Sequence, residues 1–497
     1  EHLSDYLSQP GVKAPPGFEL GMAAGGLAKG LMAKTMSSQI EGMASKFIAG
    51  TDAASALPAL EKMWKNGMCF SVDLLGEACV SDEEARLYRQ KYLDLVENLP
   101  KRVATWPAKL VLESDHLGPV PRTNVSIKIS SLSARVDPID TEGSIRTLMA
   151  EIMPILESAK KHGVLVNFDM EQFALKDLTI ELFKRCCEAV DFEAGLAMQA
   201  YLRSAPDDAR SVVDWAKRTG RVVTVRLVKG AYWDYETIHA EQQGWPVPVW
   251  SRKCDTDACS ERVAQYFIEN TPRKRGEGGV KLALGSHNAR SIAAALVTLE
   301  KCGMPKSAIE LQMLHGMGDP LKAAAMAMGL RVREYVPVGE MIPGMAYLVR
   351  RLLENTSNES WLKAGFLDNA DVETLVASPF REHDSDPGID RIQNAPERHA
   401  LSIAVPGLGD GRAFFTEPMR NFAVAAVRTQ FAAAVAAATV PVVRNDSAVA
   451  DATRAVANAD AAFPQWRDTP HTERAAAIVR AASLMRARRD ELSAILI

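Results

Sequence analysis

Short apolar, β-branched runs alternate with longer amphipathic runs through residues 69–355, and this alternation constrains the fold more than any other feature of the sequence. Short apolar runs rich in β-branched residues are typical of buried strands, whereas apolar residues three and four apart indicate helices. Eight strand candidates follow one another, at 69–75, 125–130, 164–170, 195–201, 222–228, 280–287, 309–314 and 331–338. This repetition predicts an α/β fold, a closed parallel (β/α)8 barrel of the TIM type.

The segments between the strand candidates carry helical patterns with clear ends. Residues 145–156 place apolar side chains on one helical face, and Gly163 ends that helix. Asn288 suits the N-cap of a helix that reaches Cys302, because its side chain accepts hydrogen bonds from the first free N–H groups. An open, doubly wound sheet is the alternative, but it is disfavoured because no GxGxxG turn follows the first strand.

We expect four parts along the chain: an N-terminal helical arm at 1–62, the barrel at 63–360, a connector at 361–420 and a C-terminal helical segment at 421–497. The connector contains several turn-forming dipeptides, and the last segment is rich in alanine. The sequence begins without methionine and stops inside a helical pattern. We therefore expect it to be a piece of a longer protein.

The composition disfavours several classes of protein. With 58 Lys and Arg against 62 Asp and Glu, the net charge of −4 argues against a protein that binds nucleic acid. The 7 cysteines are scattered without a CxxC pair, which favours free thiols in a reducing cytoplasm. The sequence contains neither an HExxH motif nor a Cys/His spacing typical of metal ligands, so it predicts no metal site.

Charged and polar side chains stand at or just after the C-terminal ends of the predicted strands. In a (β/α)8 barrel these ends carry the catalytic groups. A charge inside an apolar strand is costly unless it is paired or binds a ligand. The residues concerned are Asp73, Glu77, Lys128, Asp169, Glu171, Gln199, Arg226, Lys229, His287, His315 and Tyr335. Together they predict a polar mouth that binds a ligand, although a structural ion pair is the alternative for any one of them.

Part of this set suits a dinucleotide such as FAD. Arg226, Lys229, the Gly230 backbone and His287 supply hydrogen-bond donors for a pyrophosphate. Trp233 adds a flat surface for a ring, with simple packing as its alternative role. This combination suits a dinucleotide such as FAD bound at the mouth of the barrel.

A double arginine follows the last strand. On a helix, Tyr347, Arg350, Arg351 and Glu354 share one face, because they lie three or four residues apart. Two adjacent arginines near the barrel mouth suit a bidentate clamp on a carboxylate, and a solvated basic face is the alternative. Lys128, inside a strand, also fits the Schiff-base lysine of an aldolase, which we keep as a second mechanism.

These residues lie in motifs that resemble a known family. The runs at 226–234 (RLVKGAYWD) and 347–355 (YLVRRLLEN) resemble signatures of proline dehydrogenases, and shorter matches occur at 126–130, 199–201, 287–288 and 314–318. The resemblance covers residues 30–365 and points to the bifunctional bacterial proline utilization A flavoenzymes. Residues 463–467 and 472–497 resemble the opening of the aldehyde dehydrogenase domain of that family, which uses NAD. That domain stops here before its catalytic cysteine motif, so NAD is expected only for the complete domain.

The resemblance implies a function and partners. The enzyme would oxidise L-proline to Δ1-pyrroline-5-carboxylate by hydride transfer to FAD and pass the electrons to a quinone, the first step of proline catabolism to glutamate. It would be cytoplasmic, with transient peripheral contact at the inner face of the cell membrane, and no nucleic-acid partner is expected. A homo-oligomer is left open. Two other readings also remain, a folate-reductase-like flavin barrel and a barrel that binds ligand without turnover.

The resemblance also implies roles for single residues. Arg350 and Arg351 would clamp the proline carboxylate, with Lys128 nearby and Glu77 pairing with an arginine. The pocket around the pyrrolidine ring would be formed by Leu314, Tyr335 and Tyr347, with Asp169 beside substrate and flavin. The residues expected to line FAD are Gln199, Arg226, Val228, Lys229, Gly230, Trp233, Ser251, Lys253, His287, Gln312 and Glu354. Trp361 would cover the adenine.

Overall fold

The computed structural model describes residues 47–340 except Glu77, then Gly344, Met345, Tyr347 and Arg350, and residues 372–380, 417–442 and 446–497. Glu77, Arg351, Glu354 and Trp361 lie outside the described residues, as do most of the predicted arm and connector. The chain divides into two compact units. One comprises Glu1–Glu236 and Pro248–Gln393, and the other comprises Thr237–Val247 and Asn394–Ile497.

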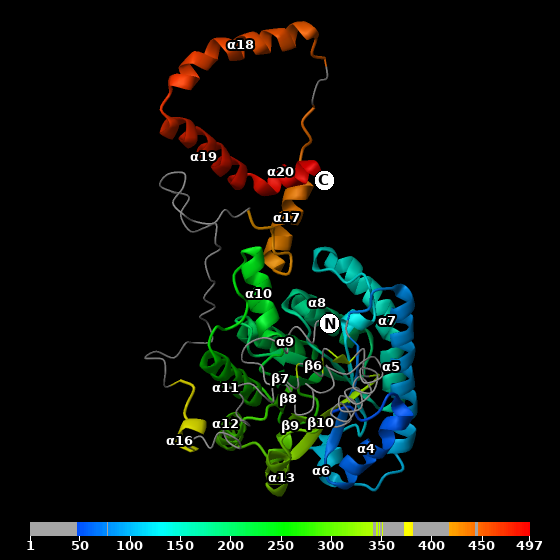
Figure 1. The fold of residues 1–497 in the computed structure, drawn as a ribbon. Helices are drawn as coiled ribbons and strands as arrows, with labels where there is room; N and C mark the ends of the chain where they lie inside the picture. Colours follow the sequence, from blue (N-terminus) through cyan, green and yellow to red (C-terminus); the bar gives the residue numbers. More distant parts are fainter. Residues whose placement is uncertain are drawn as a thin grey trace, which may run out of the picture. The chain divides into compact units, whose positions relative to one another are not determined.

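The first unit contains a closed barrel of eight parallel strands, in the order β1-β10-β9-β8-β7-β6-β5-β4 (Figure 1). The strands are β1 (Cys69–Leu74), β4 (Asn124–Ile127), β5 (Leu165–Phe168), β6 (Glu193–Gln199), β7 (Val222–Val228), β8 (Gly279–Gly285), β9 (Ile309–Leu314) and β10 (Arg331–Val338). The predicted (β/α)8 barrel is therefore confirmed, and the open sheet is wrong. Five strands, β1, β4, β5, β6 and β8, end one to three residues earlier than predicted. The chain enters a 3-10 helix at Ile129–Ser131 soon after β4, and β5 stops at Phe168, before the polar residues of the mouth.

Helices connect consecutive strands around the barrel (Figure 1). The longer helices of this unit are α4 (Ala53–Lys65), α5 (Asp82–Val103), α7 (Thr141–His162), α8 (Phe173–Ala189), α9 (Ala205–Thr219), α11 (Lys253–Glu269), α12 (Ala289–Lys301) and α13 (Asp319–Ala327). Helix α10 (Trp233–Gln243) begins in this unit and ends in the second one. Gly163 ends α7 in the left-handed conformation, at a φ of 63°, and Asn288 caps α12 through its side chain, both as predicted. Shorter elements are α6 (Leu110–Glu113), α16 (Val372–Leu375) and 3-10 helices at Pro138–Asp140 and Lys306–Ala308.

The barrel has a polar interior and an apolar outer layer. Successive side chains of a strand point to opposite faces. Phe168 therefore points outward and meets Phe183 of α8 edge to face, with ring centroids 5.4 Å apart. The adjacent Asn167 and Asp169 are joined by an Nδ2–Oδ1 hydrogen bond of 3.1 Å. The same alternation lines the interior with polar side chains from most strands.

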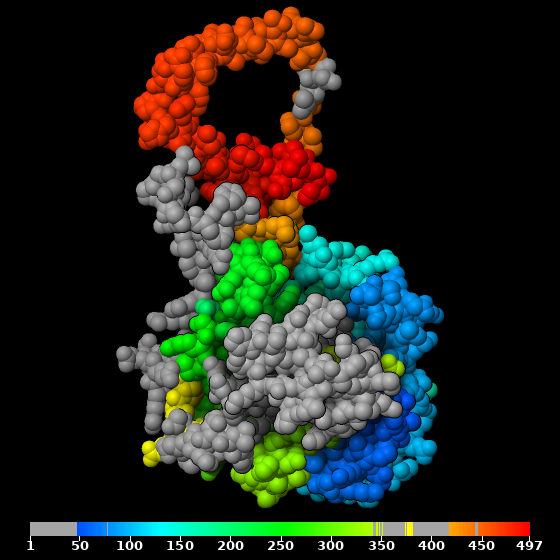
Figure 2. All heavy atoms as spheres, viewed as in Figure 1, coloured from blue at the N-terminus to red at the C-terminus, as the bar shows by residue number. Residues whose placement is uncertain are grey.

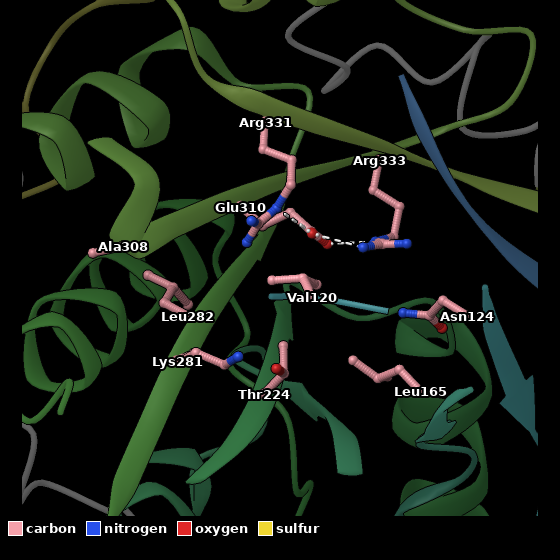
Figure 3. A pocket seen from close by; sticks show the side chains of 10 residues that line it. All are labelled: Val120, Asn124, Leu165, Thr224, Lys281, Leu282, Ala308, Glu310, Arg331 and Arg333. Atoms are coloured by element: carbon pink, nitrogen blue, oxygen red, sulfur yellow. Dashed lines mark hydrogen bonds and ion pairs between the residues drawn. The ribbon is translucent and has the colours of Figure 1, made fainter. Parts of the chain in front are cut away.

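At the end of the barrel where the strands begin, charged side chains line part of a pocket (Figure 3). The Glu310 carboxylate accepts hydrogen bonds from Arg331 Nε at 2.9 Å and Arg333 Nε at 2.7 Å. An antiparallel pair, β2 (Ser114–Asp115) and β3 (Gly118–Pro119), supplies Asp115, whose Oδ2 is 2.9 Å from Lys281 Nζ. This end thus contains ion pairs that were not predicted from the sequence.

The second unit contains α17 (Ala425–Ala437), α18 (Val449–Asp468), α19 (His471–Ala487) and α20 (Arg489–Leu496), so the predicted C-terminal helical segment is confirmed. Arg420, which precedes α17, forms an ion pair with Asp490 of α20, with its Nε 2.9 Å from Asp490 Oδ1. In Figure 2 the atoms of α18 and α19 form an arc coloured orange to red. Their apolar side chains Phe463, Trp466 and Leu484 are exposed. Across the described residues, no helix has the length and apolar character needed to cross a membrane.

Candidate active site at the mouth of the barrel

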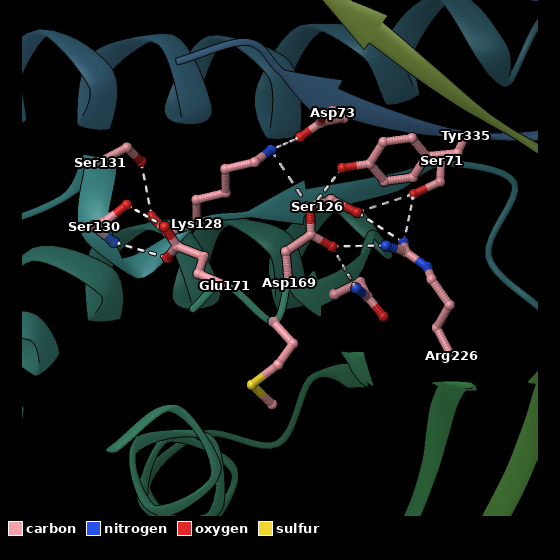
Figure 4. Close-up of polar contacts among 12 residues, drawn as sticks. Ser71, Asp73, Ser126, Lys128, Ser130, Ser131, Asp169, Glu171, Arg226 and Tyr335 are labelled. Atoms are coloured by element: carbon pink, nitrogen blue, oxygen red, sulfur yellow. Dashed lines mark hydrogen bonds and ion pairs between the residues drawn. The ribbon is translucent and has the colours of Figure 1, made fainter. Parts of the chain in front are cut away.

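Asp169 is the centre of a buried polar network at the C-terminal end of the barrel (Figure 4). Its Oδ1 accepts a hydrogen bond of 2.6 Å from Arg226 Nη1, and its Oδ2 accepts one of 2.7 Å from the Tyr335 hydroxyl. Lys128 Nζ lies 3.5 Å from the same Oδ2. These groups come from the ends of β4, β5, β7 and β10, which only the closed barrel brings together.

Lys128 also forms a short ion pair with Asp73 of β1. Burial lowers the pKa of Lys128, but the carboxylates of Asp73 and Asp169 outweigh burial and hold this pKa well above its usual value. The lysine side chain is therefore a buried ammonium group.

The acids of the network differ from one another. Burial raises the pKa of Asp169, but Arg226 and Lys128 outweigh it, so this pKa lies below its usual value. For Asp73 the effect of burial exceeds the opposing effect of Lys128, so the pKa of Asp73 is raised. Burial and the two carboxylates raise the pKa of Tyr335 well above its usual value, so the phenol keeps its proton.

The guanidinium group of Arg226 donates hydrogen bonds to side chains inside the barrel. Its Nε donates to Gln312 Oε1 at 2.7 Å, and its Nη2 donates to Ser126 Oγ at 2.8 Å. The guanidinium carbon lies 4.8 Å from the centroid of the Tyr335 ring. The structure thus joins Arg226 and Gln312, both predicted to line a flavin, to the network of Asp169.

Gln199, at the end of β6, is buried, and only one of its two polar side-chain atoms has a hydrogen-bond partner among the described residues. Its Nε2 donates to the Glu171 carbonyl at 3.1 Å, whereas its Oε1 has no hydrogen-bond partner among the described residues. A buried polar group without a partner costs about 1–3 kcal/mol. A donor from a bound ligand would remove this cost.

The three residues predicted to shape a substrate pocket lie in one apolar cluster. Tyr347 packs in a buried group with Phe47, Leu75 and Met317, and Leu314 and Tyr335 pack against that group. Because Tyr335 also donates to Asp169, the cluster borders the polar network.

Two loops beside the mouth hold further predicted residues. Lys229 Nζ and Lys253 Nζ lie 2.5 Å and 2.6 Å from the two carboxylate oxygens of Asp257. Trp233 is 43% exposed, and its Nε1 donates to the Trp250 carbonyl at 2.8 Å. These side chains are thus accessible but held in place.

The remaining predicted residues are placed as follows. His287 Nε2 accepts a hydrogen bond of 2.9 Å from the Leu314 backbone N–H, which links the loops after β8 and β9. The Arg350 guanidinium lies 5.0 Å from the centroid of the Tyr232 ring. Ser251 is exposed just before α11, and Val228, the last residue of β7, is half-buried.

Several residues that contact the predicted site residues were not themselves predicted from the sequence. Ser71, Ser126 and Asn167 line the interior two positions before a noted charged or polar residue, so a period of two could have found them. Asp257 lies inside a helix and gave no such signal. Among the noted strand-end residues, His315 has its Nδ1 2.6 Å from Glu334 Oε2, within hydrogen-bond distance.

Comparison with known proteins identifies the family. The sequence pattern of the family described as proline dehydrogenase matches residues 56–364, and that of the aldehyde dehydrogenase family matches residues 432–497. The bifunctional protein PutA of Klebsiella aerogenes is 30% identical over 356 residues, which is 68% of this chain and 25% of the relative. Proline dehydrogenase 1 of Bacillus subtilis is 24% identical over 324 residues, or 65% of this chain and 90% of the relative.

Solved structures agree with these matches. A crystal structure of proline utilization A from Bdellovibrio bacteriovorus, inactivated by N-propargylglycine, superimposes with a TM-score of 0.84 and 37% identity. The superposition covers 94% of this chain and 50% of the Bdellovibrio chain. The matched region thus spans about a quarter of the first bifunctional relative and half of the solved one. Because more than half of its residues match the family pattern, this chain belongs to the proline dehydrogenase family.

Proposed function

We propose that the barrel oxidises L-proline to Δ1-pyrroline-5-carboxylate with FAD as cofactor, as the first step of proline catabolism to glutamate. The observation that carries this proposal is the network of Lys128, Asp169, Arg226 and Tyr335 at the C-terminal end of a barrel that matches the proline dehydrogenase family. Catalytic groups of such barrels lie at this end. The resemblance of the motifs at 226–234 and 347–355 supports the substrate and the cofactor.

The described residues fit a flavin dinucleotide. Lys229 and Lys253 supply positive charge for phosphates, and Gln199 Oε1 is a buried acceptor that lacks a donor. Gly230 lets the backbone approach the Tyr201 ring closely, since a Cβ there would lie 2.5 Å from ring atoms. When bound, FAD would accept a hydride from C5 of proline and later yield the electrons to a quinone.

The chain's own residues would bind and orient the substrate. Arg350 and Arg351 would hold the carboxylate of proline, and Leu314, Tyr335 and Tyr347 would enclose its ring. The apolar cluster around Tyr347 would exclude water from that side of the pocket. Asp169 would hold Arg226, Lys128 and Tyr335 in fixed positions beside the reacting groups.

The charge states in the network limit the proton chemistry. Lys128 and Tyr335 keep their protons, because the pKa of each lies well above its usual value. Neither group would therefore take the proton that the amine of proline must lose before hydride transfer. Water is the acceptor in this proposal, and the protein's part is to hold the neutral amine in place.

The aldolase mechanism is disfavoured by the same observation. A Schiff-base lysine needs a lowered pKa so that a neutral amine is available. Lys128 lies between two carboxylates, and its pKa is raised.

The further partners in this proposal are supported by the family resemblance. They are a quinone acceptor, transient contact with the inner face of the cell membrane, and a second copy of the chain in a homo-oligomer. The proposed location is the cytoplasm. NAD would bind only to a complete aldehyde dehydrogenase domain, of which residues 432–497 match the beginning.

Replacing Arg351 by methionine tests the substrate clamp. We expect kcat/KM for proline to fall by about 30-fold to several thousand-fold, since removing one partner of a buried charge pair costs about 2–5 kcal/mol. The flavin content should not change, because the phosphate-binding residues are untouched. Steady-state kinetics with an artificial acceptor and flavin content per chain check both parts. Normal proline kinetics in this variant would show that the clamp is assigned wrongly.

Replacing Gly230 by alanine tests the proposed cofactor site. Gly230 has a φ of 131°, and an added Cβ would collide with the Tyr201 ring, so we expect the loop to shift and purified protein to lose most of its flavin. Gly163→Ala is the matched control, because Gly163 also has a positive φ, of 63°, but an added Cβ there meets nothing within 4 Å. The control should cost about 1 kcal/mol of stability and retain flavin. Equal flavin content in both variants would argue against a cofactor at Gly230.

A further inference from the structure

Asp257 joins two lysines that come from different parts of the chain. Its Oδ1 is 2.5 Å from Nζ of Lys229, which follows β7, and its Oδ2 is 2.6 Å from Nζ of Lys253, the first residue of α11. One carboxylate thus ties the loop after β7 to the start of a helix. An ammonium group has three N–H donors, and each of these hydrogen bonds engages one of them.

The surroundings of the two lysines favour an anion. Two ammonium groups and one carboxylate leave a local excess of one positive charge. The N-terminus of α11, a helix of 17 residues, adds the positive end of its dipole, and the side chain of its N-cap Arg252 forms no capping hydrogen bond. The Asp257 side chain is 14% exposed, against 25% for Lys229 and 40% for Lys253. The carboxylate is thus the more sheltered partner, and the ammonium groups are the more accessible ones.

We propose that Asp257 is a positioning residue that holds the ammonium groups of Lys229 and Lys253 together as one receptor for the pyrophosphate of the dinucleotide. This inference rests on the proposed function, in which the chain binds FAD. Asp257 acts through the two lysines and does not itself touch the cofactor. Its negative charge would repel a phosphate, so its contribution is the fixed position and the charge of the lysines.

The charge of Lys229 depends on this contact. Burial and the neighbouring Lys253 lower its pKa, and Asp257 opposes both. The other charged group that faces Lys229 is Glu261 of α11, which is itself paired with Arg290 of α12 at 3.2 Å. Without Asp257 the pKa of Lys229 would fall further, and the ammonium group would lose its proton as the pH rises. A variant without this carboxylate would then bind phosphate less well at high pH.

Asp257→Asn tests the inference, because it removes the charge and keeps the size of the side chain. We expect the dissociation constant for FAD, measured by flavin fluorescence with the full chain, to rise about 10-fold at neutral pH. The loss should grow further toward pH 9 in the variant, while the wild-type chain changes less. A purely structural role would give no such dependence on pH.

The matched control is Asp255→Asn, two residues earlier on the same helix, where the carboxylate pairs with Arg252 at 3.1 Å. This variant should bind FAD as the wild-type chain does at both pH values. If Asp257→Asn binds FAD as tightly as the wild-type chain or more tightly, the inference is wrong while the proposed function stands. If the wild-type chain itself binds no FAD, the proposed function fails, and this inference fails with it.

Discussion

Replacing Asp169 by asparagine is expected to lower kcat/KM for L-proline by about 100-fold or more. The carboxylate of Asp169 has two acceptor oxygens, one near Arg226 and one near Lys128, whereas an amide has only one. In the variant one of the two buried cations therefore faces an NH2 group and loses its negatively charged partner. Tyr335 loses a hydrogen bond of 2.7 Å and with it a fixed position. A displacement of about 1 Å at a catalytic site can cost about 10²-fold in rate. Anaerobic stopped-flow reduction by proline measures this step without the quinone.

Asp115→Asn is the control for this prediction. Asp115 is also a buried carboxylate, paired with Lys281 at 2.9 Å, but it lies where the strands begin, at the other end of the barrel. Its variant should lose stability while keeping nearly all of the proline turnover per folded molecule. If both variants lose turnover equally, the effect comes from weakened folding, and Asp169 has no special part in the reaction.

Replacing Glu310 by alanine should destabilise the barrel by about 3–5 kcal/mol, because it leaves two buried arginines without a counter-charge. Glu310 accepts hydrogen bonds from Arg331 and Arg333 inside the barrel, and all three side chains are buried (Figure 3). Equilibrium unfolding in urea, followed by circular dichroism, measures the change. The exposed pair of Arg86 and Glu83 supplies the control, and Glu83→Ala should change the free energy of unfolding by less than about 1 kcal/mol.

The pH dependence gives a second check on Glu310. Burial raises its pKa, but Arg333 and Arg331 outweigh burial and lower it from 4.5 to about 2. Because the folded pKa is depressed, the carboxylate stabilises the fold fully above the unfolded pKa and loses this contribution as the pH falls toward 2. The stability difference between the wild-type chain and Glu310→Gln should therefore shrink below pH 4.5. A difference that stays constant down to pH 2 would contradict the assigned ion pairs.

The fold could be predicted from the sequence because each strand is short, apolar and separated from the next by a helical pattern. The ends of β4, β5, β6 and β8 were less well predicted. In β4 and β5 the reason is that apolar residues, Ile129 and Met170, continue past the last paired residue. The hairpin of β2 and β3 was missed because strands of two residues carry no periodic signal.

The site was predictable as a set of residues but not as a set of contacts. Polar side chains at strand ends identify the mouth of a barrel. Their partners depend on which strands become neighbours and in which register, which one sequence does not state. Lys128 pairs with Asp73, 55 residues earlier, because β1 and β4 close the barrel side by side. Lys229 pairs with Asp257, 28 residues later, inside a helix.

The most direct test of the proposed function is the visible spectrum of the purified chain, recorded before and after L-proline is added without oxygen. We expect an oxidised flavin spectrum that bleaches on addition of proline, and heat should release FAD from the protein. A flavin that stays oxidised would keep the cofactor but contradict proline as substrate. A colourless protein that takes up no added FAD would contradict the central claim.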